Sequence, residues 1–232
     1  MLWCRLSLVF TVVVAISTLL SCSSAVREKR EYYASRQPRE LWREAKDSTG
    51  TFVRHGRCVA YHENGQEREA GEYHYGRKAG VWTTRDERGR LVEWCEYEAD
   101  QLHGKFISYY PKGTKRQEGK YVGGQRDGVW RQWYDDGSLK EDGAYIDGKQ
   151  HYVWTSWYRG GQKQEECTYR NGKLDGPYLT WRENGLRWVE GAYKNGLKVG
   201  IWTTWDELGM VFSQEQYESG KRVTKPSNAA SE

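Results

Sequence analysis

The fold follows from a stretch that recurs along the chain, GVWRQWYDDGSLKEDGAYIDGK, residues 128–149. Four of its features return every 24 residues between about residues 50 and 220, in seven copies. Gly128 stands two residues before an aromatic ring, Gly137 follows nine residues later, and Tyr145 and Gly148 complete the unit. The columns of Gly137 and Tyr145 are unbroken in all seven copies. A fixed period of this length predicts a repeat array in which neighbouring units bury a shared stripe.

Each repeat contains two signals for tight turns. Asp136-Gly137 and its equivalents form the first signal, and Asp147-Gly148 and its equivalents form the second. Both dipeptides favour two-residue type I′ turns, because Asn, Asp and Gly tolerate the positive φ angles that such turns need. The chain has 12 Trp, 17 Tyr and 26 Gly, a mixture suited to thin β structure. We therefore predict an all-β fold, an elongated single-layer antiparallel meander of seven stacked 24-residue β-hairpin repeats.

The first turn also predicts a register. If Asp136-Gly137 closes a hairpin, Trp130 lies opposite Gly143, and large rings face small residues in most repeats. An aromatic ring in this position shields the exposed backbone of a strand glycine. The same arithmetic pairs Cys58 with Gly71, Trp82 with Cys95, Phe106 with Gly119, Trp154 with Cys167, Tyr178 with Gly191 and Trp202 with Glu215.

The internal cysteines fit this register as small residues. Cys95 and Cys167 stand in the column that glycine occupies elsewhere. Three repeats separate them, about 30 Å at the usual spacing of strands, which is beyond the reach of a disulfide. No Cys-x-x-Cys spacing is present, so we expect free structural thiols and no zinc site.

A second column of rings begins three residues after the first. Its members are Tyr61, Tyr109, Trp133, Trp157, Trp181 and Trp205, with Arg85 interrupting the series. Strict alternation puts the two columns on opposite faces of the sheet, and a bulge would put them on the same face. Both arrangements are open at the level of sequence. The candidate binding surface consists of Tyr109, Trp133, Trp157, Trp181 and Trp205.

The N-terminus has the order of a secretory signal. A charged start precedes an uncharged apolar run over residues 6–20, and Cys22 follows a small residue. We interpret residues 1–21 as a signal peptide of the lipoprotein type and Cys22 as the lipidated residue. An ordinary cleaved signal and an uncleaved short anchor are the alternatives. This interpretation predicts an exported, membrane-anchored lipoprotein that faces the periplasm or the cell surface.

The remaining segments complete the predicted organisation. Residues 22–53 are predicted to be an anchor and a short helical linker, because 25–46 is rich in Arg and Glu and Pro38 suits a first helical position. The repeat array is assigned to 54–222 and a disordered tail to 223–232. The helical segment would cover the first edge strand of the array.

The stretch quoted above resembles a MORN repeat of the longer bacterial variety, found in proteins often called YwqK-like antitoxins. The likeness spans roughly residues 54–222, and the departures are Tyr152 for Gly, Arg85 for an aromatic residue and Asp100 for Gly. The resemblance implies an elongated meander that acts as a scaffold or binding module.

Catalysis and cofactor chemistry have no signal in the sequence. His55, His62, His74, His103 and His151 occupy different repeat phases without metal spacing, and no nucleophile or phosphate-loop motif is present. The net charge of +4 comes from interspersed side chains and gives no reason to expect nucleic acid. We predict a protein that is not an enzyme and that uses no cofactor and no metal.

Three binding functions are consistent with these features. The first is a membrane-anchored scaffold that binds another envelope protein, since Trp, Tyr and Arg dominate interface energetics. The second is a module that stacks its rings on a glycan or peptidoglycan, or cages a quaternary ammonium group. The third is binding to a lipid surface or an antitoxin-like role. The direction in which the second ring column points distinguishes these hypotheses.

Overall fold

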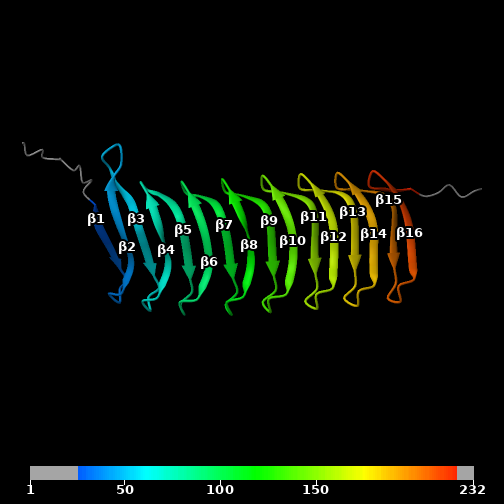
Figure 1. The fold of residues 1–232 in the computed structure, drawn as a ribbon, viewed down its shortest axis with the longest axis horizontal. Helices are drawn as coiled ribbons and strands as arrows, with labels where there is room; N and C mark the ends of the chain where they lie inside the picture. Colours follow the sequence, from blue (N-terminus) through cyan, green and yellow to red (C-terminus); the bar gives the residue numbers. More distant parts are fainter. Residues whose placement is uncertain (1–25, 224–232) are drawn as a thin grey trace, which may run out of the picture.

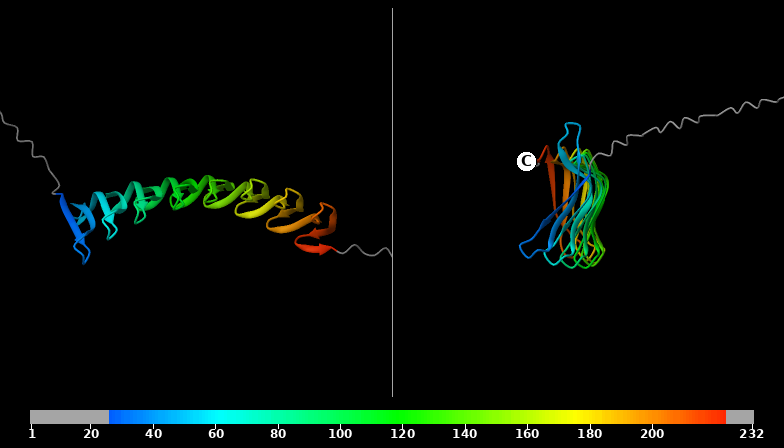
Figure 2. Two further views of the ribbon diagram at one scale, coloured as in Figure 1. Left: turned by 90° about the horizontal axis from the view of Figure 1, so that it is seen from below. Right: turned by 90° about the vertical axis from the view of Figure 1, so that its left-hand side faces the viewer.

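The computed structural model describes residues 26–223 as one row of 17 antiparallel strands. Each strand pairs with the strand that follows it, and the described residues contain no helix (Figure 1). The array is elongated, one layer thick and gently curved (Figure 2). The strands are β1 Arg27–Tyr32, β2 Pro38–Lys46, β3 Phe52–Tyr61, β4 Glu67–His74, β5 Arg77–Arg85, β6 Leu91–Glu98, β7 Gln101–Tyr109, β8 Lys115–Val122, β9 Gln125–Trp133, β10 Leu139–Ile146, β11 Lys149–Trp157, β12 Lys163–Arg170, β13 Lys173–Trp181, β14 Arg187–Lys194, β15 Leu197–Trp205, β16 Val211–Glu218 and β17 Lys221–Val223.

The predicted all-β antiparallel meander is confirmed, and so is its register. Trp130 of β9 pairs with Gly143 of β10. The other six predicted pairs also occur: Cys58 with Gly71, Trp82 with Cys95, Phe106 with Gly119, Trp154 with Cys167, Tyr178 with Gly191 and Trp202 with Glu215.

The second turn of each repeat has the predicted type I′ geometry. Asp147 and Gly148 have φ angles of 48° and 75°, as the two central residues of such a turn require. Asp100 stands where the other repeats have the second glycine of this turn, and the turn has the same shape. Its φ is 69°, and its carboxylate accepts a hydrogen bond from the Lys78 amide at 2.7 Å.

The prediction of a two-residue turn at the first signal was wrong. Gly137 has a φ of 91°, but Asp136 is not left-handed, and the Gly137 amide donates to the Tyr134 carbonyl at 3.0 Å. This is a type I turn followed by a glycine bulge. The Asp136 carboxylate accepts from the Ser138 amide at 2.9 Å, which stabilises the right-handed conformation of the loop. An extra residue in β10, Lys140, then restores the predicted register.

The prediction of a helical segment before the array was also wrong. β1 and β2 form a further hairpin, in which Trp42 pairs with Cys58 of β3 and Ala45 is buried. Helix propensities differ by only fractions of a kcal/mol per residue, roughly 0 to 0.7. A nine-residue strand on the otherwise open edge of β3 outweighs them. Pro38 is the first residue of its strand, where proline is tolerated.

The predicted boundaries of the array differ slightly from those of the structure. β3 begins at Phe52, two residues before the predicted start of the array, and Val223 lies in β17 rather than in a tail. The signal segment 1–21, Cys22 and residues 224–232 lie outside the described residues. Residues 26–223 contain no helix with the length and hydropathy needed to cross a bilayer.

Candidate binding surface

The first ring column forms the core of the array. Trp82, Trp130, Trp154 and Trp202 are between 2% and 5% exposed, although the sheet has only one layer. The tyrosine column supplies the missing second layer, because Tyr145 packs edge-on between Trp130 and Trp154, with ring centroids 6.2 and 5.0 Å apart. Edge-to-face pairs at this range stabilise by about 0.5–1.5 kcal/mol beyond their burial. The first column is therefore packing, and it offers little surface to a partner.

Each tryptophan of this column lies on the glycine of the preceding hairpin. An added Cβ on Gly143 would stand 2.1 Å from the ring of Trp154, and one on Gly71 would stand 2.2 Å from the ring of Trp82. The register prediction was confirmed, but the ring that covers each glycine comes from the next hairpin and not from the hairpin partner. The covered glycine thus locks neighbouring repeats together.

The contact between a ring and the small residue of the preceding hairpin also explains where the cysteines stand. Cys95 and Cys167 stand where the next ring is Phe106 or Tyr178, which are smaller than tryptophan. Where the next ring is tryptophan, the covered residue is glycine. The pair of small residue and ring therefore keeps a similar combined size along the array, which close packing demands.

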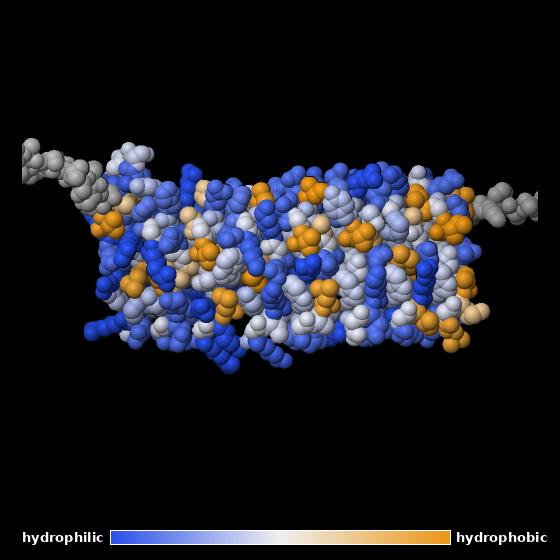
Figure 3. All heavy atoms as spheres, viewed as in Figure 1, coloured by the Kyte–Doolittle hydropathy of each residue, from blue (hydrophilic) through white to orange (hydrophobic). Residues whose placement is uncertain are grey.

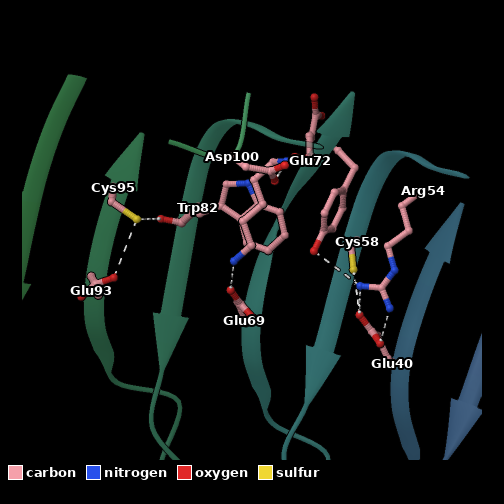
Figure 4. Close-up of polar contacts among 11 residues, drawn as sticks. Glu40, Arg54, Cys58, Glu69, Glu72, Trp82, Glu93, Cys95 and Asp100 are labelled. Carbon is pink, nitrogen blue, oxygen red and sulfur yellow. Dashed lines mark hydrogen bonds and ion pairs between the residues drawn. The ribbon is translucent and has the colours of Figure 1, made fainter. Parts of the chain in front are cut away.

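The described thiols are free and buried. Burial raises the pKa of Cys58 to about 12, and the carboxylate of Glu40, which accepts from its Sγ at 3.3 Å, adds to the shift (Figure 4). Burial likewise raises the pKa of Cys95 and of Cys167 to about 12. Thiols held in the protonated form are poor nucleophiles and poor metal ligands.

Lysine and arginine side chains cover the rings of the first column. The Lys78 ammonium lies 3.9 Å from the ring centroid of Trp82 and 2.6 Å from a carboxylate oxygen of Glu69. The guanidinium carbon of Arg126 lies 4.2 Å from the centroid of Trp130, and Lys198 stands over Trp202 in the same way at 4.1 Å. The cation–π sites of these tryptophans are thus already filled from within the chain.

The second ring column lies on the opposite face. β9 alternates regularly from Val129 to Trp133, since the extra residue of the bulge belongs to β10. Val129, Arg131 and Trp133 consequently share one face, and Trp130 points to the other. Of the two arrangements that the sequence left open, opposite faces is the one that occurs. All five candidate residues, Tyr109, Trp133, Trp157, Trp181 and Trp205, are partly buried.

A row of exposed aliphatic side chains runs beside the second column. Val81, Val129, Val153 and Ile201 each precede a first-column ring by one residue, so they lie on the face of the second column. They are between 44% and 61% exposed. We call this row together with the second ring column the outer aromatic face. The face is interrupted by Arg57 and Lys105 at equivalent positions.

Hydrogen bonds hold the second column in place. The hydroxyl groups of Tyr110, Tyr134 and Tyr158 donate to the carbonyl oxygens of Trp133, Trp157 and Trp181, at 2.8–2.9 Å. Each bond joins the first loop of one hairpin to the next hairpin. Sequence reasoning missed this tyrosine column, although the adjacent pairs Trp133-Tyr134 and Trp157-Tyr158 would have indicated it. The ladder thus links successive hairpins beside the second ring column.

Three of the five histidines bond to turns. The Nδ1 atoms of His55, His103 and His151 lie 3.3–3.4 Å from the amides of Tyr75, Gly123 and Asn171, from which they accept hydrogen bonds. Each bond connects a strand to the type I′ turn of the following repeat unit. No three metal-ligating side chains gather within residues 26–223.

Three consecutive segments identify the repeat. Residues 102–122, 126–147 and 150–171 match the family model of the MORN repeat variant. These are MORN-type repeats. Such repeats are generally binding or scaffold modules rather than catalytic ones. No curated protein matches the chain.

Two solved structures share only limited similarity with the chain. The Tc holotoxin pore of Photorhabdus luminescens is 14% identical, with a TM-score of 0.25 over 84% of this chain and 11% of the other. The crystal structure of TcdB2-TccC3 is 10% identical, with a TM-score of 0.21 over 86% of this chain and 14% of the other. The chain thus spans only a small part of the length of both proteins.

Proposed function

We propose that the protein is a non-catalytic, membrane-anchored repeat scaffold that binds another envelope protein along its outer aromatic face. The observation that carries this proposal is the row of exposed Val81, Val129, Val153 and Ile201 beside the half-buried second ring column. Exposed apolar residues that recur on one face beside aromatic rings are typical of a surface that binds a partner. The first ring column is buried beneath tyrosines and cations, whereas the rings of the second column are only partly buried and the nearest cations lie farther away, 5.6–6.0 Å from the centroids of Trp133, Trp181 and Trp205. The outer aromatic face is therefore the binding candidate.

The chemistry of this face suits a protein partner. Tryptophan and tyrosine supply large contact areas at little cost in side-chain entropy, and they are enriched in interface hot spots. Arg57, Lys105 and Arg131 are interspersed on the same face and provide the polar surroundings that such hot spots need. Equivalent positions recur every two strands, about 9.6 Å apart. An extended partner with its own regular spacing would engage several repeats at once.

The anchor completes the proposal. The apolar run over 6–20 and Cys22 support attachment through a lipid, with the array facing the periplasm or the cell surface. We expect Cys22→Ser to move the protein from the membrane fraction to the soluble fraction of exported proteins. Continued membrane association of that variant would contradict lipid anchoring at Cys22.

Crosslinking in intact cells tests the binding face. One variant replaces Trp133, Trp157, Trp181 and Trp205 with Ala. A second variant, Val129→Glu with Val153→Glu, places charge on exposed positions where folding is little affected. Both should lose the same crosslinked envelope protein while their circular dichroism stays that of the native chain.

Matched controls keep this experiment decisive. Tyr75→Ala and Tyr152→Ala remove exposed rings that lie at the second turn and at a bulge, away from the outer aromatic face, and should retain the partner. An unchanged partner list in the glutamate variant would refute the proposed face. Cosedimentation of the purified chain with peptidoglycan, lost in the glutamate variant, would instead assign the face to a glycan.

A further inference from the structure

A small pocket opens beside the first ring column, between β11 and β14. Its volume is about 270 Å³, and its lining includes Ser156, Glu165, Thr180 and the exposed ring of Trp188. Ligand pockets usually measure about 300–1,000 Å³, so this one suits a group of the size of a single side chain. Figure 3 shows one face of the array as hydrophilic residues with separate hydrophobic spots between them. On such a mixed surface, a small ligand depends on the groups of one pocket.

Three oxygen acceptors lie in one row across this pocket. Ser156 of β11 pairs with Glu165 of β12, and Glu165 pairs with Thr180 of β13, so the three side chains share the face of the first ring column. The Thr180 hydroxyl accepts the Val189 amide at 3.0 Å and keeps a second lone pair. A carboxylate between two hydroxyl groups matches the three N–H donors of an ammonium group.

Glu165 is the one charged residue in the lining. Its carboxylate accepts from the Tyr178 hydroxyl at 2.7 Å and from the Cys167 Sγ at 3.6 Å, and it forms no ion pair within residues 26–223. Burial raises the pKa of the Tyr178 hydroxyl, and the hydrogen bond to Glu165 adds to the shift, so this hydroxyl keeps its proton and donates it. A partly buried carboxylate is stabilised by an opposite charge beside it.

At an equivalent place in the array, the chain supplies that opposite charge itself. Glu69 stands four repeats before Glu165, and the Lys78 ammonium binds it at 2.6 Å. The position equivalent to Lys78 holds Leu174 at the pocket. The carboxylate is thus kept at the pocket and its lysine is not.

A second internal cation is also replaced at the pocket. Ser108 stands three repeats before Thr180, and its hydroxyl accepts from the Nε atom of Arg116 at 3.2 Å. The position equivalent to Arg116 holds Trp188, the extra residue of the bulge in β14. A bulge re-aims a side chain, and here it brings an aromatic ring to the pocket.

We propose that this pocket binds a primary ammonium group on a short alkyl chain, with the nitrogen between Ser156, Glu165 and Thr180. The alkyl chain lies against the ring of Trp188, as the stem of a lysine lies on an apolar surface. A lysine side chain of a partner has this chemistry, and so does a small free alkylamine. The pocket is on the face opposite to the outer aromatic face, so this inference does not rest on the proposed function.

Titration of the isotope-labelled chain with n-butylammonium, followed by nuclear magnetic resonance, tests this proposal. The indole N–H resonance of Trp188 should shift, with a dissociation constant on the order of millimolar for so small a ligand. Glu165→Gln should weaken binding at least tenfold, because it removes the charge and keeps the shape. Leu174→Lys supplies an internal ammonium as Lys78 does, and should abolish binding. The far-UV circular dichroism of both variants should stay that of the native chain.

Glu93→Gln is the matched control, because Glu93 stands beside Cys95 as Glu165 stands beside Cys167 but lies outside the pocket. That variant should bind n-butylammonium as the native chain does. The variant Val129→Glu with Val153→Glu should bind it too, because only the outer aromatic face is changed.

Two further probes separate the sources of the ammonium group and test its charge. Binding of acetyl-lysine methylamide in the same pocket would assign the site to a lysine of a partner, and binding of n-butylammonium alone would assign it to a small free amine. Equal binding of uncharged n-butanol would overturn the proposal. Unchanged binding in Glu165→Gln, or no shift of the Trp188 resonance at several tens of millimolar n-butylammonium, would overturn it as well.

Discussion

Single residues in this array are chosen by what the neighbouring hairpin leaves for them. Gly143 has no side chain because the ring of Trp154 takes that space, and Cys95 has a small one because Phe106 takes less. Tyr152 occupies a column that is otherwise glycine, and it keeps the left-handed backbone of that column with a φ of 63°. Glycine at 143 avoids a clash with the Trp154 ring, whereas Tyr152 holds a backbone conformation that is strained for a residue with a side chain. Single substitutions can measure both effects.

Tyr152→Gly should stabilise the protein. A left-handed conformation costs a residue with a Cβ about 1–2 kcal/mol, partly offset by the greater freedom of glycine in the unfolded chain. We expect a gain of about 0.5–1 kcal/mol in the free energy of unfolding, measured by urea titration. The reverse change at an equivalent site, Gly128→Tyr, should lower stability. A loss of stability in Tyr152→Gly would mean that its exposed ring contributes more than the strain costs.

The size relation between covered residue and ring predicts a coupled pair. Cys95→Gly leaves a hole beside Phe106, and Phe106→Trp alone overfills the site, each costing about 1–3 kcal/mol. The double variant reproduces the Gly and Trp pair found at Gly143 and Trp154, and should regain about 1–2 kcal/mol as a coupling energy. Urea titration of the four proteins measures this term. Additive losses would show that packing there is independent of the neighbouring ring.

The buried thiols predict a loss of stability in alkali. In the folded chain the thiols of Cys58, Cys95 and Cys167 have a pKa of about 12, whereas a cysteine thiol in the unfolded chain has a pKa of about 8.5. Between these values the unfolded state releases protons that the folded state retains, so stability falls as pH rises. Urea midpoints at pH 7.5 and 10 should therefore differ more for the native chain than for a Cys→Ala triple variant. Equal differences would show that the thiols do not contribute.

At the scale of elements, the hairpin of two strands is the smallest unit that preserves the array. Every strand reverses the chain direction, so β9 and β11, with β10 between them, run the same way and present their rings in the same order. The tyrosine ladder and the covered glycines then join each hairpin to the next. Any change that keeps this alternation can be accommodated, and a change that breaks it affects all the later strands.

Deleting 125–148, which comprises β9, β10 and the turn after them, should therefore leave a folded protein. The deletion joins the turn at Gly124 to Lys149 with all columns in register. Deleting 125–136 removes a single strand and reverses the direction of every later one, so it should abolish cooperative unfolding. Near-UV circular dichroism and thermal melts compare the two. A folded half-repeat variant would contradict the dependence on strand alternation.

At the scale of the whole molecule, the array is a one-dimensional chain of contacts. Each strand makes most of its contacts with the strands next to it in sequence, and ring contacts such as Phe106–Trp130 reach no farther than the next hairpin. The stability of such an array is roughly a sum of units and nearest-neighbour interfaces. The middle is supported from both sides and the ends from one side, so the free energy of local opening should rise toward the centre.

Native-state hydrogen exchange should reveal this gradient. We expect the amides of β1 and β17 to exchange first and those of β9 and β10 to exchange last, by at least a hundredfold in rate. Uniform exchange along the chain would indicate a single cooperative unit instead.

Local chemistry repeated in sequence determined most of the architecture. The glycine and tyrosine columns predicted the meander, the type I′ turns at Asp147-Gly148 and all seven cross-strand pairs, because a hairpin closes between neighbours in the chain. These contacts lie within one hairpin, close to the turn in sequence.

Tertiary structure decided the features that depend on distant residues or on competing interactions. The helical propensity of 25–46 yielded to the open edge of β3, and the first turn is a three-residue loop with a glycine bulge in all seven repeats. The ring on each glycine comes from the next hairpin, and the face of the second column depended on which strand carries the bulge. Those outcomes are set by packing between hairpins, which the periodicity of one chain does not encode.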